Sequence, residues 1–264
     1  MMSLVRSRSH LRTPLATAAL ALASLLLSCG GGELPRPRPV TSKLDEVYIA
    51  RVPPAERPEV STTQNEFQLA RSNKMTAEDE FNKANTDVRL AEAEVEKATI
   101  EERSANLKKK DAESTHDMTQ VNAAAAEVRA AELGRRAADK HVAFARARRD
   151  YLKMVVRYHE FEVINKEARF ELAKAKVARS KNIRPDTGFA FEAFESQQKD
   201  RSESAQRAKA DAERLRGRVM EKEKEWKDAE KEWNSARGVA APPAPATELK
   251  GEPPAGQPTP PPNQ

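Results

Sequence analysis

Few residues of this chain have the type and spacing that chemistry requires. His116, His141 and His159 could ligate a metal ion or transfer a proton, but none has a second ligand-type residue at a spacing known from metal sites. Acidic and basic residues alternate at helical spacing, which is typical of ion pairs on solvated helix faces rather than of a catalytic carboxylate pair. The sequence contains no glycine-rich phosphate loop, serine elbow or cysteine pair. We therefore expect no catalytic residue, no metal, no cofactor and no enzymatic activity.

Trp226 and Trp233 are the only tryptophans, and they lie one heptad apart. The simplest interpretation is that both belong to a seam along which one helix packs on another. The alternative is a peptide-binding groove built on the two indoles, because tryptophan is enriched among the residues that dominate binding surfaces. These two residues are the candidate interaction site.

Cys29 is the only cysteine, and the residues before it are typical of a secretory leader. Arg6, Arg8 and Arg12 precede an apolar run over residues 15–27, which is too short to span a bilayer comfortably. An unpaired cysteine in an exported chain would otherwise be an exposed, reactive thiol. The alternatives are an ordinary signal peptide with a chance cysteine, or an uncleaved anchor.

The sequence Leu26-Leu27-Ser28-Cys29 resembles the lipobox of bacterial lipoproteins. The resemblance covers about the first 30 residues. It implies that the leader is cut before Cys29, that the thiol receives a diacylglycerol group and that the new amine is acylated, for example with palmitate. Three acyl chains would hold the protein firmly on a membrane. The sorting rule of enteric members of the family then implies, from Gly30, an outer-membrane lipoprotein facing the periplasm, with the inner membrane as the alternative.

The composition favours an elongated helical protein over a compact domain. Of the 264 residues, 33% are charged and 5% aromatic, and much of the 38% hydrophobic content is alanine. Such a chain can cover narrow helical seams but cannot fill a wide core. Three of the five net positive charges lie in the leader, which has no acidic residue, so that +2 remains. Because the remaining charges of both signs are interleaved, we expect no nucleic-acid partner.

Proline, which breaks helices, divides the chain. Six of the 17 prolines lie between Pro35 and Pro58, Pro185 stands alone, and nine follow from Pro242 onward. The expected organisation is a signal peptide (1–28), a lipidated cysteine with a Pro-rich tether (29–59), a coiled-coil helical domain (60–237) and a disordered or polyproline II tail (238–264). Within the tether, residues 45–52 could form a short strand or pack on the helices.

Apolar residues recur every seventh position in the two Pro-free tracts, as in coiled coils. One seam runs from Val121 to Val177, with His159 as a tolerated polar member, and another, in a new phase, from Phe191 to Trp233. An earlier seam repeats alanine without a miss, and small residues let neighbouring helices approach closely. Its members are Ala70, Ala77, Ala84, Ala91, Ala98, Ala105 and Ala112.

The heptad phase slips over residues 108–120, where the chain either turns or continues as one long helix. We favour the turn, because folding near residue 115 lays Phe67 and Phe81 beside residues 151–164, which are apolar on more than one face. A capping box at Thr63 and Glu66 predicts the first helix start. The predicted fold class is all-α, an elongated antiparallel coiled-coil hairpin or three-helix bundle, with helices over about 60–112, 119–181 and 189–237 and disordered Pro-rich segments on both sides.

A second turn, centred near Pro185, fixes which residues face each other on the second and third helices. The numbers of facing residues add up to about 370. Three pairs of large side chains are therefore predicted to meet: Phe144 with Trp226, Leu152 with Val219, and Val177 with Phe194.

These features predict a lipid-anchored periplasmic protein that acts as a spacer or scaffold in the cell envelope. Its expected partners are the membrane, through the anchor, and an envelope protein or cell-wall material; association with further copies is left open. The alternative is an adaptor of a transport assembly, because the Ala-rich hairpin resembles the helical hairpins of periplasmic adaptor proteins in efflux systems. Those families place strand-rich lipoyl and barrel domains beside the hairpin, whereas this chain has Pro-rich segments there.

Overall fold

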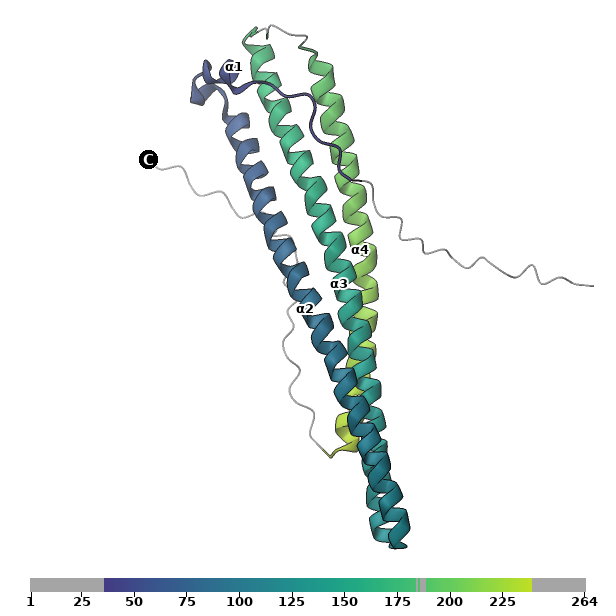
Figure 1. Cartoon of the computed structure of the whole chain (residues 1–264). Coiled ribbons are helices and arrows are strands. Elements are labelled where there is room, and N and C mark those ends of the chain that lie inside the picture. The colour runs from purple at the N-terminus through teal and green to yellow at the C-terminus, as the bar shows by residue number, and fades with distance from the viewer. Residues whose placement is uncertain (1–35, 184, 186–188, 239–264) are drawn as a thin grey trace, which may run out of the picture. The chain divides into compact units, whose positions relative to one another are not determined.

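The computed structural model describes residues 36–183, 185 and 189–238. In chain order these residues form α1 (Glu46–Ala50), the short 3-10 helix η1 (Pro54–Glu56), α2 (Pro58–Thr115), α3 (Met118–Ser180) and α4 (Phe191–Ala236). The central helix α3 packs along both α2 and α4, and α1 lies against one end of α3 (Figure 1). The all-α class is thus confirmed, and each long helix begins and ends within three residues of its predicted bounds.

The chain turns between α2 and α3 and does not continue as one helix. His116 adopts a left-handed backbone conformation with φ 58°, which histidine tolerates better than most residues. The Asp117 side chain then caps α3 by accepting hydrogen bonds from the N–H groups of Thr119 and Gln120. Two residues are therefore enough to reverse the chain.

The alanine seam forms the interface between α2 and α3. Six of its seven members are buried, and Ala91 is fully buried in a cluster with Val88, Val142 and Ala145. The Phe67 ring stacks on Phe170, with 6.5 Å between ring centroids, instead of on a residue of the predicted 151–164 segment. The reason is that the turn is centred at residues 116–117, slightly later than predicted.

The predicted register between α3 and α4 is confirmed at the aromatic pair. The rings of Phe144 and Trp226 stack with 5.3 Å between centroids and 13° between planes. Val177 and Phe194 belong to one buried cluster, to which α1 also contributes Ile49. At the other end of α4, Gly238 follows the helix with φ 66° and donates its N–H to the Ser235 carbonyl, as expected of a C-terminal glycine.

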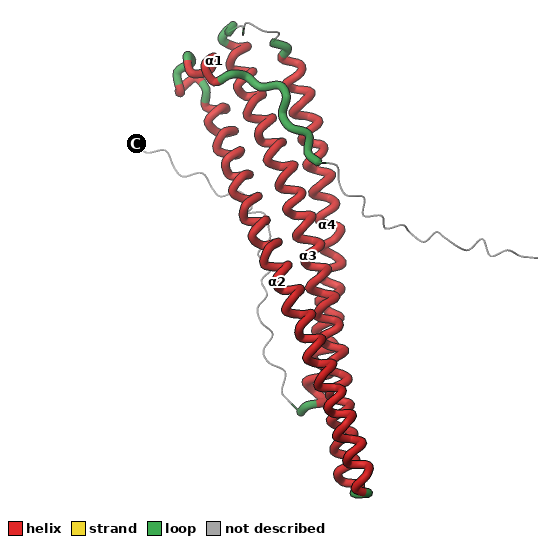
Figure 2. The backbone as a smooth tube through the Cα atoms, in the orientation of Figure 1, coloured by secondary structure: helices red, strands yellow, loops and turns green. Residues whose placement is uncertain are grey.

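The structure corrects the predicted tether over residues 36–57. Figure 2 shows the first part of this segment as a loop that crosses the long helices before α1. Val40, Leu44, Ile49 and Val52 are buried, so the segment packs on the bundle instead of running free. Of the two possibilities for residues 45–52, packing on the helices is confirmed: residues 46–50 are helical and not a strand, and Asp45 caps them with its side chain.

The start of α2 also differs from the prediction. The helix begins at Pro58, because proline is favoured at the first helical position. Thr63 lies inside the helix, buried, and its hydroxyl donates to the Glu59 carbonyl at 2.8 Å, so it is not a cap. The predicted leader with Cys29 and the predicted tail beyond Gly238 lie outside the described residues.

Candidate functional site

A buried amide on α4 holds the backbone of the segment that precedes α1. Gln197 is 6% exposed, and its Oε1 accepts hydrogen bonds from the N–H groups of Thr41, at 2.7 Å, and Ser42, at 2.9 Å. Its Nε2 donates to the Ser42 carbonyl at 3.1 Å. One side chain thus satisfies three backbone groups that would otherwise need water or a neighbouring strand.

Glu171 and Lys174, one turn apart on α3, hold the backbone of Leu44 in the same way. Glu171 Oε2 accepts from the Leu44 N–H at 2.8 Å, and Lys174 Nζ donates to the Leu44 carbonyl at 2.7 Å. The two side chains also form an ion pair at 2.8 Å and are 7% and 4% exposed, respectively. A buried ion pair is tolerated when its remaining hydrogen-bonding groups find partners, and Leu44 provides them.

We refer to Gln197, Glu171 and Lys174 as the clamp. Exposed contacts extend it: Lys43 binds Glu167 at 2.6 Å, and Arg201 donates to the Pro39 carbonyl at 3.2 Å. The hydrogen bond that Lys43 donates to the Glu167 carboxylate raises the pKa of Lys43. Together these contacts fix the path of residues 39–44 on α3 and α4.

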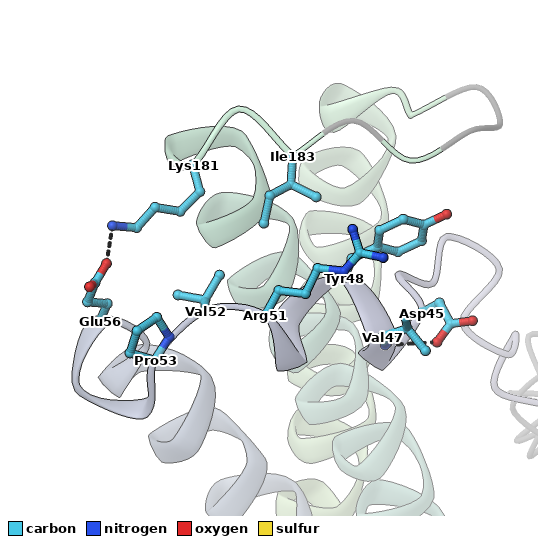
Figure 3. Close-up of a pocket in the computed structure, with 9 residues that line it drawn as sticks. All are labelled: Asp45, Val47, Tyr48, Arg51, Val52, Pro53, Glu56, Lys181 and Ile183. Atoms are coloured by element: carbon cyan, nitrogen blue, oxygen red, sulfur yellow. Dashed lines mark hydrogen bonds and ion pairs between the residues drawn. The ribbon is translucent and has the colours of Figure 1, made fainter.

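A small pocket of about 580 Å³ opens where α1 meets the end of α3 (Figure 3). An ion pair between Glu56 and Lys181 lies at one side, and Tyr48 of α1 and Arg51, which directly follows α1, lie at the other. Its lining mixes charged and apolar side chains. The lining residues are Asp45, Val47, Tyr48, Arg51, Val52, Pro53, Glu56, Lys181 and Ile183.

The two candidate tryptophans both lie at the interface of α4 with α3. The Trp226 indole stacks on two neighbouring rings of α3, with centroids 4.3 Å from His141 and 5.3 Å from Phe144. One heptad later, the Trp233 indole lies against Gly134 of α3, whose missing side chain makes room for it. Both indoles are half-buried.

Both tryptophans also line a groove of about 980 Å³, which we call the tryptophan groove. Residues of α3, mostly alanine, contribute to its lining together with side chains of α2 and α4. Four glutamates and three basic residues line it, so their charges nearly cancel. The lining residues are Glu94, Lys97, Ala98, Glu101, Ser104, Ala105, Lys108, Ala123, Ala126, Glu127, Ala130, Ala131, Gly134, Ala137, Ala138, His141, Trp226, Glu230, Trp233, Ala236 and Arg237.

Polar side chains around this groove contact each other, mostly between helices. His141 Nδ1 lies 2.7 Å from Glu94 Oε2 of α2. On the α4 side, Glu225 accepts hydrogen bonds from Lys140 and Lys222, which lower the pKa of its carboxyl to about 2. The alternation of acidic and basic residues in the sequence predicts contacts of this kind on the helix faces.

The three candidate histidines lie at separate places. His116 is in the turn, His141 is beside the tryptophan groove, and His159 lies further along α3. Nδ1 of His159 is buried without a hydrogen-bond partner, and burial lowers the pKa of this imidazole. The structure therefore does not bring the histidines into one site. Within residues 36–183, 185 and 189–238, no group of three or more metal-ligating side chains comes together.

Sequence reasoning missed both the clamp and the role of Gly134. A glycine in the middle of a long helical tract is itself a signal, because it costs the helix about 1 kcal/mol relative to alanine. The clamp residues gave no comparable signal: Glu171 and Lys174 have the spacing of any exposed ion pair on a helix. Their importance depends on the segment that covers them.

No helix in the described part of the chain is both long enough and apolar enough to cross a membrane. The chain matches no family model, no characterised protein and no solved structure.

Proposed function

We propose that the protein is a lipid-anchored helical spacer of the bacterial cell envelope, held through Cys29 on the periplasmic face of the outer membrane. The lipobox-like sequence supports the anchor. The clamp is the observation that carries the spacer function, because a spacer needs a fixed connection between its anchor and its rod.

The clamp shortens the free chain between the anchor and the rod. Without it, the residues from Cys29 to Pro58 would span up to about 100 Å when extended, as long as the rod itself. With Pro39 held by Arg201 and residues 41–44 held by the clamp, only about ten residues remain, with a reach of about 35 Å. The 63 residues of α3 extend for about 95 Å, so the rod and not the tether sets the distance.

Cell fractionation of a Cys29→Ala variant tests the anchor. We expect the variant to leave the membrane fraction and appear in the soluble periplasmic fraction. A Gly30→Asp variant is the matched control, since it keeps the lipid but should move the protein to the inner membrane where the enteric sorting rule holds. Retention of Cys29→Ala in the membrane fraction would refute the anchor.

The spacer function has its own test on a supported bilayer. A fluorophore at Met118→Cys, at the turn, reports its height above the membrane by energy transfer to a dye in the lipid. We expect a narrow distribution of heights for the lipidated protein and a broad one when Lys174→Ala opens the clamp. Equal distributions would show that the clamp does not set the position of the rod.

An adaptor of an envelope transport assembly is the second candidate. It is favoured by the hairpin tip, where α2 and α3 continue beyond the end of α4 (Figure 1). Leu107 and Met118 are 61% and 68% exposed there. Pull-down from envelope extracts with the Cys29→Ala chain separates the two candidates: a channel or pump supports the adaptor, and cell-wall material supports the spacer.

A further inference from the structure

We propose that residues 239–246 of this chain dock in the tryptophan groove as a polyproline II segment. The inference does not depend on the proposed function. It depends on the groove, on the place where α4 ends and on the composition of the residues that follow.

The segment is chemically matched to the groove. Its sequence is Val-Ala-Ala-Pro-Pro-Ala-Pro-Ala, eight residues without a charge or a polar side chain in a chain that is 33% charged. The groove is lined mostly by small apolar side chains and two indoles, and its charged lining residues nearly balance. An uncharged occupant therefore buries apolar surface there without losing the hydration of a charge.

The segment begins beside the groove. Ala236 and Arg237 are themselves lining residues, and Gly238 follows with φ 66°, a conformation that redirects the chain at a helix end. Trp233 and Trp226 are one heptad apart on α4, about 10 Å along the helix. Eight residues of polyproline II cover about 25 Å, so a segment that turns back at Gly238 passes both indoles.

The mode of recognition is one that proline-rich segments commonly use. Polyproline II helices dock on aromatic side chains in grooves, and their prolines are already ordered before they bind. Trp226 and Trp233 provide two half-buried aromatic side chains one heptad apart in this groove. Because the segment is attached to α4, its effective concentration is on the order of millimolar, and a weak contact is sufficient for occupancy.

Tryptophan fluorescence tests the proposal, because the only two tryptophans both line the groove. The reference is the full chain with Cys29→Ala, which removes the lipid. A chain that ends at Gly238 should emit at longer wavelength and be quenched more strongly by acrylamide, since water replaces the segment. A chain that ends at Ala246 is the matched control and should behave like the reference. Unchanged helicity by circular dichroism shows that all three are folded.

Two further measurements sharpen the test. Pro243→Asp in the full chain should reproduce the emission of the chain that ends at Gly238, because docking would bury the new carboxylate. A peptide of residues 239–246, added at millimolar concentration to that shortened chain, should restore the reference emission.

Several outcomes would overturn the proposal. Identical emission and quenching of the reference and the chain that ends at Gly238 would show that the segment does not cover the indoles. The same change in the chain that ends at Ala246 would assign the groove to later residues. Emission that depends on protein concentration in the reference would assign it to a second copy.

Discussion

A β-carbon placed on Gly134 would lie 2.9 Å from Nε1 of Trp233 and 3.1 Å from its Cε2. Real side chains essentially never approach a β-carbon as closely as the first of these distances. The indole therefore occupies the space that any other residue at position 134 would fill. The Trp233 indole of α4 can take this position only because residue 134 of α3 is glycine.

Gly134→Ala should move the Trp233 indole and change tryptophan emission. The substitution removes a helix penalty of about 1 kcal/mol, but the overpacked indole opposes this gain. Gly217→Ala in α4 is the matched control, because no atom lies within 4 Å of the added β-carbon. We expect Gly217→Ala to raise the free energy of unfolding by about 0.5–1 kcal/mol and Gly134→Ala to raise it by less, or to lower it. Equal gains in urea unfolding would contradict the close packing.

Removing Lys174 should destabilise the protein and release the segment before α1. Lys174→Ala leaves the Glu171 carboxylate buried without its charge partner, which typically costs about 3–5 kcal/mol. Tryptic cleavage after Lys43 and Arg51 should become faster, as the segment detaches. Lys176→Ala is the control, because its ion pair with Glu59 is exposed and such pairs contribute little. If trypsin cleaves Lys174→Ala no faster than the wild type, the clamp does not hold the segment.

The lowered pKa of His159 predicts that the protein becomes less stable as the pH falls below neutrality. Burial lowers the pKa of the folded state below the ordinary value of about 6.5, so the folded state binds fewer protons than the unfolded state. This contribution to stability is fully present above the ordinary pKa of about 6.5 and is lost as the pH falls through the lower pKa that His159 has in the folded state. His159→Leu should flatten the dependence of the urea midpoint on pH between about 7.5 and 5. A slope that persists in His159→Leu would assign the effect to other groups.

The pairing of α3 with α4 can be tested chemically at a second point. Leu152 and Val219 are both buried and are predicted partners. With Cys29 removed, Leu152→Cys and Val219→Cys should form an intramolecular disulfide at low protein concentration, since only Cα atoms within about 7 Å can be bridged. The pair Ala145→Cys and Val219→Cys, one heptad out of register, should not. Crosslinks only between chains would show that the helices pair as an oligomer.

The long helices could be predicted because their packing requires apolar residues at regular intervals along the sequence. Seven alanines at one heptad position, and a phase slip near residue 115, were enough to locate α2 and its turn. The register of α3 on α4 followed from the position of Pro185. Such signals repeat over many turns, so that one polar residue, such as His159, does not hide them.

The clamp and the ordered segment before α1 could not be predicted in the same way. Val40, Leu44, Ile49 and Val52 have no helical or strand period, and the prolines around them indicate a tether. Their burial depends on three polar side chains that are distant in sequence. The tryptophan groove could be predicted only in part. The heptad spacing of Trp226 and Trp233 is visible in the sequence, whereas only the fold shows that Gly134 lies beside Trp233.

The early end of α4 at Ala236 gives the rod two parts with different stiffness. Arg136 of α3 pairs with Glu232, so α4 stops only a few residues further along, while α2 and α3 continue to their turn at residues 116–117. Three helices side by side resist bending more than two, because stiffness rises steeply with the width of a beam. Sideways force on the tip is therefore absorbed mainly as bending just beyond Ala236.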